Sequence, residues 1–283
     1  MLAEILAHKR QEVEKRKQFM PLETIRGLLH YLEPCRPFLK TLQAKKAAHK
    51  PAVIAEIKQA SPSKGVLRTP FDPVDIASSY MRYDAACLSV LTDQHFFQGA
   101  DAYIRQIKQE VSLPILRKDF MVDAYQIYES RVIGADAVLL IAAALDAQDL
   151  IALATLAREL GMDILLEIHS LEELKSVLAL EEELIATNAP VRFDLIGINN
   201  RDLHSFVTDI QVSLDLLHYI PASRFIISES GIASRQQINL LAKAGVDGFL
   251  IGEALMRAES PGVMLAQLFQ EQVLHTTIMR STP

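Results

Sequence analysis

Eight short apolar segments recur between residues 52 and 251, and this recurrence restricts the fold more than any other feature of the sequence. Each segment is four to six residues long and rich in Val, Ile and Leu, as buried strands are. Stretches with helical periodicity separate them. The strands are expected at 52–57, 86–91, 114–117, 137–141, 163–168, 194–198, 225–229 and 248–251. The helices are expected at 73–83, 99–110, 123–133, 146–160, 171–186, 212–218, 234–244 and 261–273.

This alternation predicts an α/β fold with a parallel sheet and right-handed crossovers, and eight strands can close into a (β/α)8 TIM barrel. An open doubly wound sheet is the main alternative, but no G-x-G-x-x-G follows the first strand. We therefore predict a single domain over residues 1–283. Its parts are an N-terminal helical extension at 1–50, the barrel at 51–275 and a tail at 276–283. Helices are expected at 2–18 and near 22–29, whereas 31–50 shows no regular pattern.

Composition excludes several classes of function. The net charge of −6 argues against general affinity for nucleic acid, so an anionic ligand must be bound by local donors. Cys35 and Cys87 form no disulfide framework and have no metal-ligand spacing, which fits a reducing cytoplasm, and Cys87 is expected in the core. The charged N-terminus is no signal peptide, and no apolar run approaches ~20 residues, so no membrane span is expected.

Polar side chains follow the predicted strands at their carboxyl ends, where an α/β barrel carries its active site. These are Glu56 and Lys58, Lys118 and Asp119, Glu167, then Asn199, Asn200 and Arg201, Glu229 and Ser230, and finally Gly252 and Glu253. Each has a structural alternative: an ion pair for the charged residues, and a cap or turn for the amide, serine and glycine residues. Their location at one end of successive strands favours a shared catalytic site.

Other polar residues are assigned to the surface. His95, His169 and His204 lack metal-ligand spacing and are expected to be loop or surface residues. The acidic run 181–183 and the turn-like segment 187–190 are expected to form a solvated helix end and an exposed loop.

A phosphate site is indicated by the glycines that follow the last two strands. Gly231 and Gly252 expose backbone amides there, next to the start of a short helix, and such amides bind anions. Barrels commonly bind phosphate at this position. Ser61, in the loop after the first strand, becomes adjacent when the barrel closes. We therefore predict a phosphorylated small-molecule substrate.

Seven motifs occur in order on the predicted strands: IAEIKQASPSKG, SVLTDQHFFQG, ILRKDF, LLEIH, IGINNRDL, ISESGI and FLIGEALM. Together they resemble the indole-3-glycerol phosphate synthases of tryptophan biosynthesis, and the similarity runs from LAEILAHKRQEV to about residue 258. The resemblance implies a (β/α)8 barrel whose extension covers the site. It implies a carboxy-lyase that converts 1-(2-carboxyphenylamino)-1-deoxyribulose 5-phosphate to indole-3-glycerol phosphate, carbon dioxide and water, without cofactor or metal.

The resemblance also implies roles for individual residues. Lys118 would be the general acid, and Glu167 would remove a proton as the indole ring becomes aromatic. Lys58 would contact the anthranilate carboxylate and assist dehydration, and Glu56 would orient the lysines and a substrate hydroxyl. An ammonium is a better acid when burial or positive charge lowers its pKa, and Lys58 could supply that charge to Lys118. The other expected contacts are Asn199 and Ser230 to the ribulose-derived chain, Arg201 on the anthranilate side, Phe97, Phe120, Leu139, Leu203 and Leu250 as apolar walls, and Ser61, Gly231, Gly252 and Glu253 at the phosphate.

Two departures from the family pattern stand out. Glu253 occupies a position where some members have serine, so we expect its backbone amide to face the phosphate and its side chain to turn away. The segment 181–193 is longer than usual, and its expected place at the far end of the barrel connects it with stability or oligomerisation. Only about thirty residues follow the eighth strand, too few for a fused phosphoribosylanthranilate isomerase barrel, so a monofunctional enzyme is expected.

Two other functions remain open from the residues alone. A Schiff-base aldolase would use Lys118 to attack a sugar-phosphate carbonyl. A catalytically silent barrel would act as a binding partner, although the complete acid–base set argues against it. For the synthase we expect a cytoplasmic monomer or weak homodimer, with possible contacts to other enzymes of the tryptophan pathway.

Overall fold

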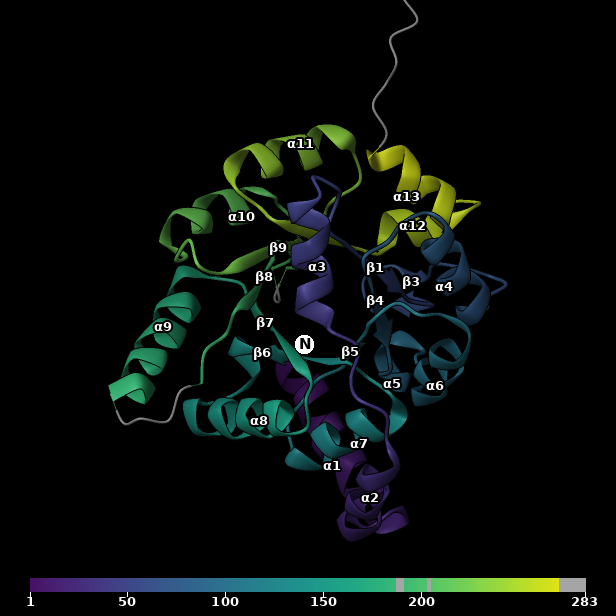
Figure 1. Cartoon of the computed structure of the whole chain (residues 1–283), viewed down its shortest axis with the longest axis vertical. Coiled ribbons are helices and arrows are strands. Elements are labelled where there is room, and N and C mark those ends of the chain that lie inside the picture. The colour runs from purple at the N-terminus through teal and green to yellow at the C-terminus, as the bar shows by residue number, and fades with distance from the viewer. Residues whose placement is uncertain (187–190, 203–204, 270–283) are drawn as a thin grey trace, which may run out of the picture.

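The computed structural model describes residues 1–186, 191–202 and 205–269, and its central element is a closed barrel of eight parallel strands (Figure 1). The strands are β1 (Val53–Ile57), β4 (Cys87–Leu91), β5 (Ile115–Lys118), β6 (Ala137–Ile141), β7 (Asp163–Ile168), β8 (Leu195–Asn199), β9 (Phe225–Glu229) and β10 (Gly248–Ile251). They pair in chain order, and β10 closes the barrel on β1. The predicted barrel is confirmed, with each strand within one residue of its expected bounds.

The helices that connect these strands form the outer layer (Figure 1). They are α4 (Pro73–Arg82), α6 (Asp101–Glu110), α7 (Ala124–Ile133), α8 (Ala147–Glu159), α9 (Leu171–Ala186), α10 (Gln211–Leu216), α11 (Arg235–Ala244) and α13 (Pro261–Phe269), with 3₁₀ turns η2 (Ala142–Ala144) and η3 (Leu217–Tyr219). Side-chain caps define several starts: Asp72, Asp123 and Asp146 each accept a backbone N–H of the first turn. Gly134 and Gly245 end α7 and α11 in the left-handed conformation that favours glycine.

Several short elements lie in the loops at the carboxyl ends of the strands. The hairpin of β2 (Ala60–Ser61) and β3 (Gly65–Val66) and the helix α5 (Gln94–Phe97) have no counterpart among the sequence predictions, whereas α12 (Glu253–Arg257) is a short helix of the kind expected beside the glycines. Each of these strands and helices is five residues or fewer, which is too short to show a periodic pattern.

Alternate residues along each strand point into the barrel. On β1, Val53, Ala55 and Ile57 pack outward among the helices, whereas Ile54 packs in the barrel interior. The next inward residue is Glu56, which faces a cavity at the carboxyl end. The same alternation on the other strands fills the lower barrel with apolar side chains and leaves the upper layer for polar ones.

The N-terminal extension covers both ends of the barrel. It contains α1 (Leu2–Phe19), α2 (Leu22–Leu28), η1 (Leu29–Tyr31) and α3 (Phe38–Ala47). Met1, Leu2 and Ile5 line the cavity at the carboxyl end. At the other end, α3 lies across the barrel centre in Figure 1, and its Phe38 and Leu42 pack among the first residues of several strands. The expectation that the extension covers the site holds for α1, whereas α3 closes the opposite end of the barrel.

One residue of the acidic run is another correction, whereas Glu182 and Glu183 are exposed as expected. Glu181 is buried, accepts a hydrogen bond from the Phe193 backbone at 2.5 Å and forms an ion pair with Arg224. It joins α9 to the start of β9 instead of facing solvent. The predicted loop 187–190, Leu203, His204 and the tail 276–283 lie outside the described residues.

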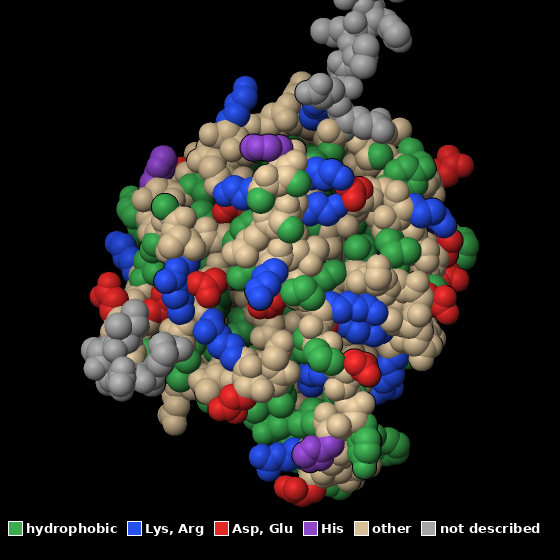
Figure 2. Space-filling model, viewed as in Figure 1, with side chains coloured by type: hydrophobic (Ala, Val, Ile, Leu, Met, Phe, Trp, Pro, Cys, Tyr) green, Lys and Arg blue, Asp and Glu red, His purple; other side chains and the backbone are tan. Residues whose placement is uncertain are grey.

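The face that carries α3 has mixed charge (Figure 2). Lys45 and Lys50 pair with Asp84, and Lys46 pairs with Asp247. These pairs tie α3 to the starts of neighbouring strands. Among the described residues, none of the helices is long and apolar enough to span a membrane.

Phe38→Ala tests the role of α3 as a plug. Phe38 is fully buried, so its truncation should lower the free energy of unfolding by about 3–5 kcal/mol. Phe19→Ala is the matched control because Phe19 is 88% exposed, and it should change the value by less than about 0.5 kcal/mol. Denaturant unfolding measures both. Equal effects of the two substitutions would contradict the packing described for α3.

Candidate active site

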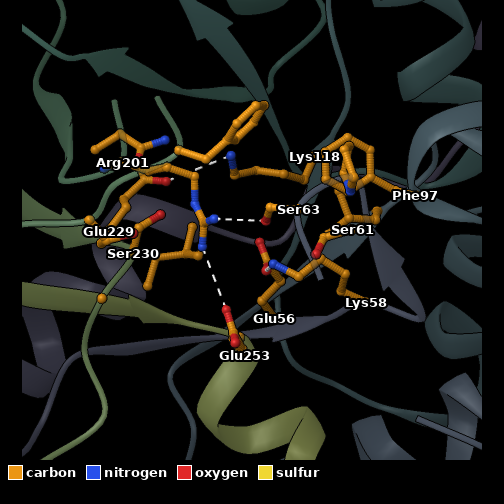
Figure 3. A pocket seen from close by; sticks show the side chains of 18 of the residues that line it. Glu56, Lys58, Ser61, Ser63, Phe97, Lys118, Arg201, Glu229, Ser230 and Glu253 are labelled. Atoms are coloured by element: carbon orange, nitrogen blue, oxygen red, sulfur yellow. Dashed lines mark hydrogen bonds and ion pairs between the residues drawn. The ribbon is translucent and has the colours of Figure 1, made fainter. Parts of the chain in front are cut away.

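A cavity of about 620 Å³ opens at the carboxyl ends of the strands (Figure 3). All fifteen predicted site residues that the structure describes line it: Glu56, Lys58, Ser61, Phe97, Lys118, Phe120, Leu139, Glu167, Asn199, Arg201, Ser230, Gly231, Leu250, Gly252 and Glu253. They come from separate strands and loops and converge because the barrel closes. The cavity is also lined by Glu229, one of the strand-end groups expected at the shared site, for which the sequence predicted no individual role.

Lys118 and Glu167 form the central ion pair. Lys118 Nζ donates a hydrogen bond to Glu167 Oε2 at 2.9 Å and lies 3.7 Å from Glu229 Oε2. Asn199 Nδ2 donates to the other Glu167 oxygen at 3.1 Å. Glu167 and Glu229 are at most 2% exposed, and the ammonium is one of the groups that offset the burial of the Glu167 charge.

Glu56 and Lys58 form a second ion pair on β1 and the residue that follows it. Glu56 is 5% exposed, and its backbone carbonyl accepts a hydrogen bond from Tyr80 at 3.2 Å. Gly252 makes room for the carboxylate, because a Cβ at that position would lie 2.2 Å from Glu56 Oε1. The sequence predicted that these two side chains share a face, and they do.

Carboxylates, not cations, determine the charge state of Lys118. Burial alone would lower its pKa, but Glu167, Glu229 and Glu56 raise it above the ordinary lysine value. The expectation that burial and Lys58 lower this pKa is therefore wrong for the ligand-free site. Lys118 carries its proton at neutral pH.

Glu167 and Glu229 have opposite charge preferences. Burial disfavours the charge on Glu167, but Lys118 and His169 outweigh it and lower the pKa of this carboxyl. Burial and the nearby Glu167 raise the pKa of Glu229 to about 8. Two neighbouring buried carboxyls thus divide into one ionised and one protonated group at neutral pH. Gly197 makes room for Glu229, since a Cβ there would lie 2.0 Å from Glu229 Oε1.

His169 lies in the loop after β7, as one half of the sequence prediction had it, but its side chain is not at the surface. Its side chain is 9% exposed, and its Nε2 lies 3.3 Å from Glu167 Oε1. The spacing of two residues from Glu167 was the signal that could have located it, because such residues share a strand face. His95, by contrast, stacks on His8 of α1 with ring centroids 4.4 Å apart.

The turn after β9 is held in an unusual conformation. Ser230 has φ of 66° and Gly231 has φ of 73°, and the first value is uncommon for a residue with a side chain. Asn200 supports this turn by donating to the Ser230 carbonyl at 3.0 Å. Asn200 is buried and also accepts from Ser213, so it is a structural residue, whereas Asn199 faces the cavity.

The other side of the cavity is lined by serines and arginines. Arg201 donates to Ser63 Oγ at 2.9 Å and lies 3.6 Å from Glu253 Oε2 (Figure 3). Glu253 Oε1 accepts from Arg257 Nε at 3.1 Å. The Glu253 side chain therefore does not turn away from the cavity, contrary to the expectation, and two guanidinium groups contact its carboxylate. Ser61 lies on the facing hairpin.

Apolar side chains form the remaining wall. Phe97 and Phe120 lie with ring centroids 6.2 Å apart, and Leu139 and Leu250 also line the cavity. A flat aromatic group fits such a wall. Within residues 1–186, 191–202 and 205–269, no group of three His, Cys, Asp or Glu side chains could hold a metal ion.

Residues 2–268 match the family model described as indole-3-glycerol phosphate synthase. The chain belongs to the indole-3-glycerol phosphate synthase family. A synthase from Acidithiobacillus ferrooxidans is 48% identical over 269 residues, which are 95% of this chain and 98% of the relative. One from Polaromonas naphthalenivorans is 49% identical over 271 residues, 96% of this chain and 99% of the relative.

Two solved structures are similar in fold. KGPDC from Streptococcus mutans has a TM-score of 0.55 at 12% identity, covering 77% of this chain and 95% of that one. The N-acetylmannosamine-6-phosphate 2-epimerase from Clostridium perfringens has a TM-score of 0.53 at 15% identity, with coverages of 72% and 86%. At these identities the likeness shows the barrel fold alone.

Membership of the indole-3-glycerol phosphate synthase family makes this chain a carboxy-lyase of tryptophan biosynthesis that acts on a phosphorylated substrate. The resemblance seen in the seven motifs is thereby confirmed. The aldolase and the catalytically silent barrel are set aside.

Gly197→Ala tests the space reserved for Glu229. The new Cβ should displace the carboxylate and lower the free energy of unfolding by about 1–3 kcal/mol. The loss should be smaller in a Glu229→Ala background, where the clash is absent, and denaturant unfolding of the double-mutant cycle measures this difference. Gly27→Ala is the control, since a Cβ there meets nothing within 4 Å. An equal loss of unfolding free energy in both backgrounds would contradict the claim that Gly197 makes room for Glu229.

The raised pKa of Glu229 predicts a pH dependence of stability. Folded Glu229 keeps its proton up to about pH 8, whereas an ordinary glutamate releases it near 4.5. The folded state therefore binds more protons in this window, and the free energy of unfolding falls as pH rises from 4.5 to 8. Glu229→Gln should flatten this slope in urea unfolding, whereas Glu110→Gln at an exposed position should not. An unchanged slope in Glu229→Gln would exclude the protonated carboxyl.

Proposed function

We propose that Lys118 and Glu167 are the general acid and the general base of ring closure. The observation that carries the proposal is their 2.9 Å contact inside one cavity. The ketone oxygen to be protonated and the methylene to be deprotonated belong to neighbouring substrate carbons. An acid and a base in contact can therefore reach both.

The first step forms a carbon–carbon bond. The ring carbon that bears the carboxylate attacks the ketone, and Lys118 donates a proton to the ketone oxygen, which becomes a hydroxyl. The carboxylate then leaves as carbon dioxide, and its electron pair restores the aromatic ring. The raised pKa of Lys118 ensures that the donor is charged before the reaction starts.

The second phase removes water. We assign protonation of the departing hydroxyl to Lys58, which Glu56 orients through their ion pair. Glu167 takes the proton from the methylene next to the nitrogen, and the indole ring forms. Glu229 lies 3.7 Å from Lys118, and as a protonated carboxyl it would donate a hydrogen bond to a substrate hydroxyl. The products are indole-3-glycerol phosphate, carbon dioxide and water, and no cofactor is required.

Substrate binding uses the remaining walls of the cavity. We assign the ribulose-derived chain to Asn199 and Ser230, and the anthranilate carboxylate to Lys58 and Arg201. The phenyl ring would lie against the apolar wall of Phe97, Phe120, Leu139 and Leu250, with Leu203 kept as a proposed contact. The phosphate would bind Ser61 and the backbone amides of Gly231, Gly252 and Glu253. Its arrival would compete with Glu253 for Arg257.

The setting of the reaction is proposed as well. Cys35 and Cys87 are free thiols, which fits a reducing cytoplasm. We propose a monomer or weak homodimer that can contact other enzymes of the tryptophan pathway, built as one domain from extension, barrel and tail.

Two substitutions test the acid–base pair. Lys118→Ala and Glu167→Gln should each lower the rate of indole formation by at least about 10²-fold with little loss of substrate binding. Indole fluorescence follows turnover, and titration with the substrate measures affinity. Lys243→Ala, at an exposed position on α11, is the control and should retain full activity. Activity within a fewfold of wild type in Lys118→Ala would remove it from the general-acid role.

A further inference from the structure

His169 contacts the carboxylate that we assign as general base. It follows β7 by one residue, so it faces the same side of the strand as Glu167. Its Nε2 lies 3.3 Å from Glu167 Oε1, and its side chain is 9% exposed. His169 is not among the described residues that line the cavity, so it acts on Glu167 without reaching the substrate.

Glu173 holds the opposite edge of the same imidazole. Its Oε2 lies 3.4 Å from His169 Nδ1 and accepts the His169 backbone N–H at 2.8 Å. Glu173 is the third residue of α9, and its own N–H donates to Ser170 Oγ at 3.2 Å, which secures the first turn. A carboxylate is also favoured at a helix N-terminus. The result is a continuous row of carboxylate, imidazole and carboxylate.

An imidazole between two carboxylates is most stable in its protonated form, whose charge faces both of them; the Nε2 contact with Glu167 is a charge contact without hydrogen-bond geometry. A neutral ring has one nitrogen without a proton, and that nitrogen would face a carboxylate oxygen with no hydrogen between them. Burial alone would lower the pKa of His169, but Glu167 and Glu173 raise it to about 10. Geometry and charge therefore agree on an imidazolium at neutral pH.

We propose that His169 is a positioning residue: held by Glu173, its imidazolium orients Glu167 and keeps that carboxylate ionised. This inference rests on the proposed function of Glu167 as the base.

The need for such a residue follows from the neighbours of Glu167. Glu229 competes for the same cation, since both carboxylates lie within 4 Å of Lys118 Nζ. Lys118 could also pass its proton directly to Glu167, which would disable the acid and the base together. The additional positive charge of His169 opposes both events. With this charge beside Glu167, the Lys118 proton is transferred to the ketone and not to Glu167. The same charge keeps Glu167 ionised after Lys118 has become neutral.

Histidine NMR tests the protonation of His169 between Glu167 and Glu173 without measuring turnover. In the ligand-free wild-type enzyme, the His169 ring should remain doubly protonated at pH 8, and its signals are assigned by their loss in His169→Gln. Glu173→Gln should move its titration to lower pH. A neutral His169 ring at pH 7 in the wild type would overturn the proposal.

The pH profile of single-turnover indole formation tests the effect on the base. His169→Gln should move the acid limb, which reports ionisation of Glu167, up by about one pH unit or more, with little change in substrate affinity. His169→Lys retains a cation and should restore the limb. His218→Gln is the matched control, because His218 is exposed on η3, and it should leave the profile unchanged. An acid limb that stays in place in His169→Gln would overturn the proposal.

Separate results test the role of Glu167 as the base and the role of His169 in positioning it. If Glu167→Gln keeps near wild-type activity, the base assignment fails whatever His169 does. If Glu167→Gln is inactive but His169→Gln keeps the wild-type rate and pH profile, only the positioning role fails.

Discussion

The contact between the Lys118 ammonium and the Glu167 carboxylate is the interaction on which the rest of the site depends. Both groups are withdrawn from water at the top of an apolar barrel, where an unpaired charge would cost several kcal/mol. Their pairing makes that burial tolerable and also sets the charge of the neighbours. Glu229 becomes the protonated carboxyl because burial and the negative charge of Glu167 together outweigh the effect of Lys118 on its pKa.

The barrel builds this contact through its inward alternation. Lys118 and Glu167 belong to β5 and β7, which are separated by β6, and only a curved sheet brings their ends across one opening. The α1 helix is tied to the same rim by charge. Lys9 is buried between Asp93 and Asp119 at 2.8 and 2.9 Å, and Asp119 is the residue after Lys118. The helix that covers the cavity and the strand that supplies the acid are therefore joined by one buried ion cluster.

Periodicity carried the fold prediction because strands and helices of a barrel repeat the same local pattern eight times. Residues with special chemistry at the strand ends could likewise be named in advance. The predictions that failed share one cause: each concerns a residue whose environment is made by partners far away in the sequence. The sequence around Phe38 shows no regular pattern, and its packing partners at the lower end of the barrel come from distant strands. Glu181 reads as solvated until Arg224 is beside it.

By itself the sequence determined the strand count, the order of the elements, the family and the set of polar groups at one rim, because local periodicity and short motifs are enough to identify each of them. Tertiary structure alone decided how those groups divide their charge. The direction of each pKa shift comes from burial and from partners on other strands, so the raised pKa of Lys118, the protonated Glu229 and the clamped His169 emerge only when the barrel closes.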